Sequence, residues 1–282
     1  MTEETSRTWF VTGASSGIGL AVARAAAGRG DNVAALARTT AALDPLVERH
    51  GSRVLGQVAD VRRPADVEDA VARTLDAFGR IDVVVNNAGY GLFGAVEEST
   101  DTQARATFET NVFGVLHVLR ATLPVLRAQR SGHVLQGSSY YGRIAEPGVG
   151  LLSATKYAVE GLTDALVPEL EPLGIKVTLV EPGPTATAFL SNLAVADSIA
   201  DYDQTVREVQ KAIGELPPET FNAPDRVAAA MLSVVDAERP PRRLVTGNFA
   251  VKVIREALES QLAELEAWKT TALAVDDVLV AS

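Results

Sequence analysis

The chain has 282 residues and contains no cysteine. This absence excludes disulfides, thiol catalysis and thiolate metal sites. The three histidines, His50, His117 and His133, stand singly and far apart. Lone histidines at such spacings are usually structural residues, so we expect no metal site.

The sequence also lacks an excess of basic charge and any long apolar run. It has 26 Lys and Arg against 36 Asp and Glu, and the net charge of −10 disfavours a nucleic-acid surface. The longest apolar runs are strand-sized, and the polar, acidic segment 1–7 has no apolar core of signal-peptide length. We therefore expect a cytoplasmic protein with neither a nucleic-acid nor a membrane partner.

What the sequence does contain is enough apolar material for a sizeable core, with 47% hydrophobic residues. Short apolar runs alternate with helical patterns, and helices are expected over 103–130, 153–171 and 224–236 among others. The alternation predicts an α/β fold, a single domain over residues 1–282 with a doubly wound parallel sheet flanked by helices. The expected strands are residues 9–12, 32–37, 54–61, 81–85, 133–138, 175–181 and 243–246.

Two segments depart from this alternation. Residues 184–222 follow the sixth strand, where open α/β sheets bind ligands, so we interpret them as a lid-like insertion over a substrate, with a plain surface excursion as the alternative. Residues 250–282 form a C-terminal helix and tail, with an apolar stripe over 250–268. Because the polar face of this helix is acidic, we expect the stripe to pack on the domain or on a partner subunit rather than on a membrane.

A glycine motif follows the first strand and reads Thr12-Gly13-Ala14-Ser15-Ser16-Gly17-Ile18-Gly19. Glycines between a strand and a helix let a pyrophosphate approach the helix N-terminus, although a glycine cluster alone is often only a tight turn. Two further motifs follow in the chain, Asn86-Asn87-Ala88-Gly89 and the stretch from Ser139 to Lys156. In this order the three motifs resemble the short-chain dehydrogenase/reductase family over roughly residues 8 to 250.

One position departs from the family signature, which places a Tyr four residues before the Lys and thirteen after the Ser. Ser139 and Lys156 fit this spacing, and the position between them is Leu152.

The resemblance implies a Rossmann-type sheet that binds a nicotinamide cofactor. In NAD-binding members a carboxylate at the end of the second strand binds the ribose, and here that position is Arg38. Its planar, charged guanidinium suits the 2′-phosphate of NADP(H). The alternative is a solvated loop arginine. Ser15 can add a hydroxyl. By resemblance, Asp60 and Val61 contact the adenine, Asn87 and Gly89 lie beside the ribose, and Thr187 faces the nicotinamide amide. The expected cofactor-binding residues are Gly13, Ser15, Ser16, Ile18, Gly19, Arg38, Asp60, Val61, Asn87, Gly89, Lys156, Pro182, Gly183, Thr185 and Thr187.

Reduction of a ketone leaves charge on oxygen, so the reacting centre needs a hydrogen-bond donor and a proton source there. By resemblance, Ser139 orients the carbonyl, Lys156 holds the ribose hydroxyls, and Asn111 supports a water-linked proton path. Leu152, at the position of the family's acid, can donate nothing. Tyr140 or Tyr141 could offer a displaced phenol, but we expect both to line the pocket.

The sequence thus predicts an NADP(H)-dependent oxidoreductase of the short-chain type, a homo-oligomer that interconverts a carbonyl and an alcohol on a small apolar substrate. We expect its activity to be impaired or redirected by Leu152. The alternatives are a catalytically silent NADP(H)-binding protein, an engineered variant, or a non-carbonyl reaction with the same cofactor.

Overall fold

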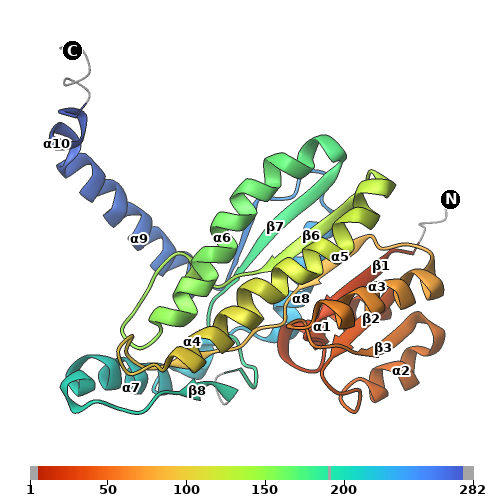
Figure 1. The fold of residues 1–282 in the computed structure, drawn as a ribbon, viewed down its shortest axis with the longest axis horizontal. Coiled ribbons are helices and arrows are strands. Elements are labelled where there is room, and N and C mark those ends of the chain that lie inside the picture. Colours follow the sequence, from red (N-terminus) through yellow and green to blue (C-terminus); the bar gives the residue numbers. More distant parts are fainter. Residues whose placement is uncertain (1–5, 190–191, 276–282) are drawn as a thin grey trace.

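The computed structural model describes residues 6–189 and 192–275. Its centre is a seven-stranded sheet in which every neighbouring pair is parallel, in the order β3-β2-β1-β4-β6-β7-β9 (Figure 1). The strands are β1 (Thr8–Thr12), β2 (Asn32–Ala37), β3 (Val54–Val58), β4 (Val83–Asn86), β6 (Gly132–Gly137), β7 (Ile175–Pro182) and β9 (Arg243–Thr246). This confirms the predicted doubly wound parallel sheet.

Helices cover both faces of the sheet because successive strand residues point to opposite sides. In β1, Trp9 and Val11 join the core under α1 (Gly17–Gly28), α2 (Asp44–His50) and α8 (Pro224–Asp236). Phe10 between them joins the core under α3 (Pro64–Phe78), α5 (Gly114–Gln129) and α6 (Gly150–Leu170). The apolar runs of the strands therefore supply two cores at once.

The helix expected over 103–130 is interrupted, which corrects the sequence prediction. A capping box of Thr100 and Gln103 starts α4 (Asp101–Phe108), and a π-helical turn (Glu109–Phe113) separates it from α5. Such π turns frequently occur at functional sites, and this one carries Asn111.

The strand expected over 54–61 is also too long, since β3 ends at Val58. The carboxylate of Asp60 accepts a hydrogen bond from the Arg62 N–H at 3.0 Å, while the Asp60 N–H donates to Asp66. These local bonds turn the chain away from the sheet.

The segment 184–222 lies beside the carboxyl end of the sheet. Its β8 (Ala194–Val195) pairs in parallel with β5 (Leu92–Phe93), and its helix is α7 (Glu208–Gly214). At its two ends, Thr185 and Asn222 form a β-bridge that closes the excursion.

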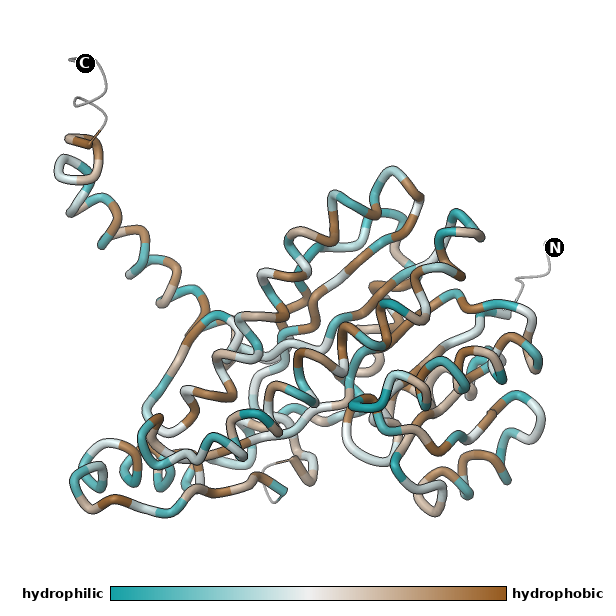
Figure 2. Tube along the Cα trace, in the orientation of Figure 1, coloured by the Kyte–Doolittle hydropathy of each residue, from teal (hydrophilic) through white to brown (hydrophobic). Residues whose placement is uncertain are grey.

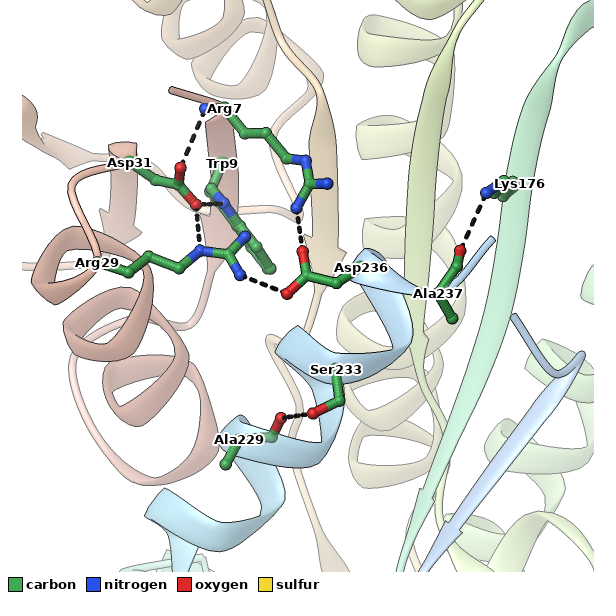
Figure 3. A network of polar contacts seen from close by, with 9 residues as sticks. All are labelled: Arg7, Trp9, Arg29, Asp31, Lys176, Ala229, Ser233, Asp236 and Ala237. Carbon is green, nitrogen blue, oxygen red and sulfur yellow. Dashed lines mark hydrogen bonds and ion pairs between the residues drawn. The ribbon is translucent and has the colours of Figure 1, made fainter. Parts of the chain in front are cut away.

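A polar network lies at the other end of the strands, where β1 begins (Figure 3). Asp31 accepts hydrogen bonds from the Arg7 N–H at 3.0 Å and the Trp9 indole at 2.8 Å. Arg29 pairs with Asp31 at 2.6 Å and Asp236 at 2.9 Å. The network ties β1 and the turn before β2 to the end of α8, far from the carboxyl ends of the strands.

The C-terminal helix predicted over 250–268 is α9 (Asn248–Ala267), followed by α10 (Lys269–Leu273). Only its beginning packs on the domain, where Ala250 and Ile254 are 0% and 5% exposed. The later part projects into solvent (Figures 1 and 2), so over 258–275 the stripe does not pack on the domain, and the alternative of a partner subunit stays a prediction. Among the described residues, no helix has the length and apolar content needed to cross a membrane.

Candidate active site

The glycine loop after β1 has the geometry of a dinucleotide cradle. Gly13 has φ +64°, a left-handed conformation that favours glycine. A Cβ on Gly19 would lie 2.4 Å from both Asn87 Nδ2 and the Gly13 carbonyl oxygen, so no larger residue fits there. Since the Ser16 side chain does not cap α1, its first N–H groups are available to an anion.

A hydrogen-bond network holds this loop against the end of β4. Thr12 Oγ1 donates to the Val85 carbonyl at 3.1 Å and accepts from the N–H groups of Asn87 at 3.0 Å and Ala88 at 3.1 Å. Asn87 Nδ2 donates in turn to the Thr12 carbonyl at 3.1 Å. The motif at 86–89, with Asn87 and Gly89, thus lies beside the glycine loop, at the point where the strand order reverses.

The loop after β7 closes over the same cradle. A Cβ on Gly17 would lie 3.1 Å from Thr187 Cγ2, so the Thr187 side chain touches the glycine loop. Thr185 Oγ1 donates to the Gly183 carbonyl at 2.9 Å and shapes the turn after Pro182. Ser15, Ser16 and Ile18 lie in the loop itself, so the structure brings these expected residues together.

Two expected nucleotide contacts lie at the ends of β2 and β3. Arg38 is exposed, and its guanidinium makes no ion pair with any residue of 6–189 or 192–275. The Asp60 carboxylate is held by Arg62 at 2.5 Å, a hydrogen bond that lowers the pKa of Asp60. The Val61 side chain belongs to the core, being 8% exposed, and its carbonyl oxygen is hydrogen-bonded to His117 Nδ1 at 2.9 Å.

The reacting centre lies at the end of β6 and on the first turns of α6. Ser139 Oγ accepts a hydrogen bond from the Tyr141 N–H at 3.2 Å, and Lys156 Nζ donates to the Gly137 carbonyl at 2.8 Å. Desolvation lowers the pKa of the Lys156 ammonium to about 8. Both side chains are thus bonded to backbone groups at or just after the end of β6.

Asn111 joins this centre through the π turn. Its Nδ2 donates to the Tyr90 carbonyl at 2.8 Å and to Thr155 Oγ1 at 3.0 Å, and its Oδ1 accepts from the Tyr90 N–H at 2.8 Å. Thr155 Oγ1 donates onward to the Leu152 carbonyl at 2.7 Å. Asn111 therefore positions the turn of α6 that carries Leu152 and Lys156.

Leu152 itself is 4% exposed and packs in an apolar cluster. The buried members of this cluster are Phe93, Ala95, Tyr140, Tyr141, Val149, Leu152, Val206, Ala250 and Ile254. The place expected for the acid is thus filled by hydrocarbon.

Two phenols, Tyr140 and Tyr141, are buried beside Leu152. The rings of Tyr140 and Tyr141 lie 4.1 Å apart, and burial is the main cause that raises the pKa of both above that of an ordinary phenol. The Tyr141 hydroxyl donates to Glu146 Oε2 at 3.0 Å. Both tyrosines belong to this apolar cluster, and burial disfavours their ionised form. That they line a substrate pocket stays a prediction.

Comparison with known proteins agrees with this geometry. The family model described as short chain dehydrogenase matches residues 7–198. The chain belongs to the short-chain dehydrogenase family. An oxidoreductase of Botryotinia fuckeliana, BOA17, is 38% identical over 271 residues, which cover 95% of this chain and 99% of the relative.

Two solved structures show how closely the fold is shared. A short-chain dehydrogenase from Streptomyces avermitilis has a TM-score of 0.90 and 37% identity, covering 96% of this chain and 99% of its own. A short-chain dehydrogenase/reductase from Burkholderia phymatum in complex with NAD has a TM-score of 0.79 and 26% identity, covering 93% and 97%. This short-chain dehydrogenase is therefore an oxidoreductase of a family that uses a nicotinamide cofactor.

Sequence reasoning missed a charged cluster behind the reacting centre. Glu181, fully buried in β7, lies 3.2 Å from Arg243 Nε and 3.6 Å from Arg143 Nη1, and Arg243 also pairs with Glu160 at 3.0 Å. Burial, followed by the Glu160 carboxyl, raises the pKa of Glu181 to about 7. A charged residue inside an apolar strand is the sequence signal that could have revealed it.

Sequence reasoning also missed Glu98, which joins segment 184–222 to the domain. Its carboxylate accepts from the Ala95 N–H at 2.7 Å and the Ile199 N–H at 2.8 Å, and it pairs with Arg207. Glu97 beside it accepts from the Tyr202 hydroxyl. Val206 of the same segment packs in the Leu152 cluster, so Glu98 helps to hold the segment beside that cluster. Within the described ranges, no group of acidic or histidine side chains is arranged to hold a metal ion.

Proposed function

We propose that this short-chain dehydrogenase binds NADP(H) and interconverts a carbonyl and an alcohol on a small apolar substrate, with activity impaired or redirected by Leu152. The observation that carries the proposal is Leu152 packed at the acid position while Ser139 and Lys156 keep backbone anchors. The positioning residues are complete and the proton source is missing.

The choice of NADP(H) rests on Arg38. Its exposed guanidinium stands at the end of β2 and is free to pair with the 2′-phosphate, whereas an NAD-binding site has a carboxylate there. The cradle of Gly13 and Gly19 accepts the pyrophosphate, and Lys156 holds the nicotinamide ribose.

When bound, the nicotinamide supplies or accepts the hydride. The Ser139 hydroxyl donates to the substrate oxygen and stabilises its developing charge. Leu152 cannot protonate that oxygen, and loss of a general acid typically lowers the rate by ~10² to 10⁴. The proton must then come from water or from a group of the substrate itself.

The apolar character of the substrate follows from what lines the centre. Leu152, Val149 and Phe93 present hydrocarbon, and Val206 brings the segment 184–222 onto the same cluster. We infer that this segment is the lid, because it is clamped by Glu98 at the carboxyl end of the sheet.

A second candidate is a nucleotide-binding protein without turnover. The raised pKa of Tyr140 and Tyr141 favours it, since neither phenol is a ready acid beside Leu152. A reaction at a bond other than a carbonyl, needing no proton on oxygen, is consistent with the same observation.

One experiment separates these functions. The protein is incubated with NADPH carrying deuterium at the transferable position and a panel of apolar ketones and aldehydes, and deuterium in the alcohol product is measured by mass spectrometry. Slow deuterium transfer supports the proposal. Thermal stabilisation by NADPH without transfer to any carbonyl overturns it in favour of the binding role.

A further inference from the structure

Glu181 is a buried carboxyl behind the reacting centre that the proposed reaction does not use. It lies in β7 with no exposed surface, and its charged neighbours come from three other elements. Glu160 lies in α6, which runs along β7 (Figure 1), and Arg243 lies in β9. Arg143 directly follows the short helical turn Tyr140–Gly142. This group of side chains therefore joins the edge of the sheet to α6 and to the turn after β6.

As an anion, Glu181 would have no hydrogen-bond donor. Arg243 Nε lies 3.2 Å from Glu181 Oε1, but its one N–H donates to Glu160 Oε2 at 3.0 Å. Arg243 Nη2 donates to Asp164 at 2.8 Å. Arg143 Nη1 is 3.6 Å from Glu181 Oε1, which is beyond hydrogen-bond distance. Both oxygens of Glu181 are thus buried without a partner in the part of the chain that the structure describes, and burying a carboxylate in this state is costly.

A proton on Glu181 removes this difficulty, because a protonated carboxyl is a hydrogen-bond donor. Glu160 Oε1 is a buried acceptor that no described residue satisfies, and it is available to that donor. Burial, and next the Glu160 carboxyl, raise the pKa of Glu181 to about 7, in agreement with this geometry. Lys156, one turn before Glu160 in α6, is a further charged group near the pair, and the Glu160 charge partly offsets the desolvation of its ammonium.

The turn after Ser139 lies directly on the carboxyl pair. A Cβ on Gly142 would lie 3.0 Å from Glu160 Cγ and 3.1 Å from Glu160 Oε1, so the backbone of the turn is in close contact with that side chain. Ser139 begins the turn, since its Oγ accepts from the Tyr141 N–H at 3.2 Å and its carbonyl from the Gly142 N–H at 2.8 Å. Arg143 ends the turn and faces Glu181.

We propose that Glu181 is a positioning residue whose proton, shared with Glu160, fixes the turn that presents Ser139. Without the proton, two buried carboxylates would repel each other, and the Glu160 side chain in contact with Gly142 would be displaced. The positioning role rests on the proposed function, because it concerns the Ser139 of that reacting centre. The proton on Glu181 does not rest on it.

The pH dependence of stability tests the proton. A carboxyl whose pKa is raised by folding stabilises the folded protein at low pH, and this contribution is lost as the pH rises through the raised value. Glu181→Gln keeps the shape of the side chain, offers Glu160 a permanent N–H donor and cannot ionise. The melting temperature of the variant relative to the parent should therefore rise by several degrees between pH 5.5 and 8.5.

Asp164→Asn is the matched control, because Asp164 pairs with the same Arg243 from the half-exposed side. It should change the melting temperature by the same amount at both pH values. If Glu181 is instead an ion-paired anion, Glu181→Gln loses those pairs, and its melting temperature relative to the parent stays constant or falls as the pH rises. Either result overturns the proposal.

Amide hydrogen exchange on the parent tests the positioning. After correction for the intrinsic pH dependence of exchange, the rate over 139–144 should rise several-fold between pH 6 and 8, as Glu181 loses its proton, while the rate over 13–19 stays constant. Glu181→Gln should remove this rise. A parent whose corrected exchange over 139–144 does not change with pH overturns the positioning role, even if the melting temperatures behave as expected.

Arg143→Met tests the same turn without altering the buried strand. It should raise exchange over 139–144 several-fold at pH 6, because the turn loses the cation that faces Glu181. Arg242→Met is the matched control, since the ion pair of Arg242 lies on the exposed side of the group, and it should leave this exchange unchanged. Equal exchange in the two variants contradicts the proposal. These measurements need neither nucleotide nor substrate, so their failure is distinct from a failure of the proposed function.

Discussion

The nucleotide end and the reacting end of the candidate site are filled by different chemistry. At the nucleotide end, glycine backbone and the polar groups of Thr12 and Asn87 leave a cradle that a single Cβ at Gly19 would fill. At the reacting end, hydrocarbon around Leu152 occupies the place where the family has its acid. The first end is shaped for a ligand, whereas the second is positioned for chemistry but lacks a proton source.

This difference shows that positioning and proton donation are separable in this fold. Ser139 is held by the Tyr141 N–H and Lys156 by the Gly137 carbonyl, so both anchors are backbone groups that need no phenol nearby. Neither anchor involves the side chain at position 152. Nucleotide binding and carbonyl chemistry can consequently be tested one at a time.

The largest expected effect comes from restoring the acid. Leu152→Tyr should raise NADPH-dependent reduction of an apolar ketone or aldehyde by ~10²-fold or more, because a phenol beside Lys156 supplies the proton. Steady-state rates over a broad carbonyl panel measure it. Leu152→Phe, which adds the ring without the hydroxyl, should stay at the parent's rate.

If Leu152→Tyr binds NADPH and gives the same rate as the parent on every substrate, a missing acid is not what limits carbonyl reduction. The reacting end would then lack more than a proton source.

Cofactor choice tests the nucleotide end. The parent should bind NADPH more tightly than NADH by ~1.5 to 3 kcal/mol, the size of a charge-assisted hydrogen bond, and Arg38→Ala should remove most of this difference. Calorimetric titration with both nucleotides measures it. Equal affinities in the parent would remove Arg38 from the site.

Lys156 lies in the reacting centre and is expected to bind the nucleotide, so its substitution tests whether it acts in binding or in chemistry. Beside Leu152 it has no phenol to acidify, so Lys156→Ala should weaken NADPH binding by ~1 to 3 kcal/mol whether or not the protein turns over substrate. Since the pKa of the ammonium is lowered to about 8, NADPH affinity in the parent should fall as pH rises through that value, where the charged donor is lost. The variant should lack this pH dependence.

Titrations from pH 6.5 to 9.5 on folded protein measure both effects. An affinity of Lys156→Ala equal to the parent at neutral pH would show that Lys156 is a helix lysine outside the site, and would weaken the assignment of 139–156 as an active centre.

How far the sequence predicts this molecule depends on the range of the interactions involved. The strand at 32–37 is found where expected because a buried parallel strand is a nearly continuous apolar run. The π turn at Asn111 was not foreseen, since apolar periodicity locates a helix but does not reveal a single widened turn within it. Strands β5 and β8 have two residues each, too few for any periodicity to show.

For the site, motif spacing located the cradle and the reacting centre but not the groups that reach them from elsewhere in the chain. Glu181 and Glu98 act through partners far away in sequence, Arg243 and Arg207, which no local pattern reveals. The amphipathic pattern of α9 likewise could not say whether its stripe meets the domain or another molecule. The three-dimensional structure shows Trp268 65% exposed, so this part of the stripe does not meet the domain.

The smallest effect concerns how Glu98 holds segment 184–222 beside the reacting end. Glu98 accepts two backbone N–H groups and the Arg207 guanidinium, and these hydrogen bonds, led by that of Ile199, lower the pKa of its carboxyl. Glu98→Gln keeps the shape of the side chain and removes its charge, so Arg207 loses its ionic partner. We expect amide hydrogen exchange over 194–207 to rise several-fold at neutral pH, while exchange over the glycine loop 13–19 stays at the parent's rate.

Glu97→Gln is the matched control, because Glu97 meets the segment only through the exposed Tyr202 hydroxyl and its loss should raise exchange less. A uniform rise over both regions would indicate general destabilisation, and no rise over 194–207 would show that the segment is held by its apolar contacts with the Leu152 cluster, so that Glu98 does not control access to it.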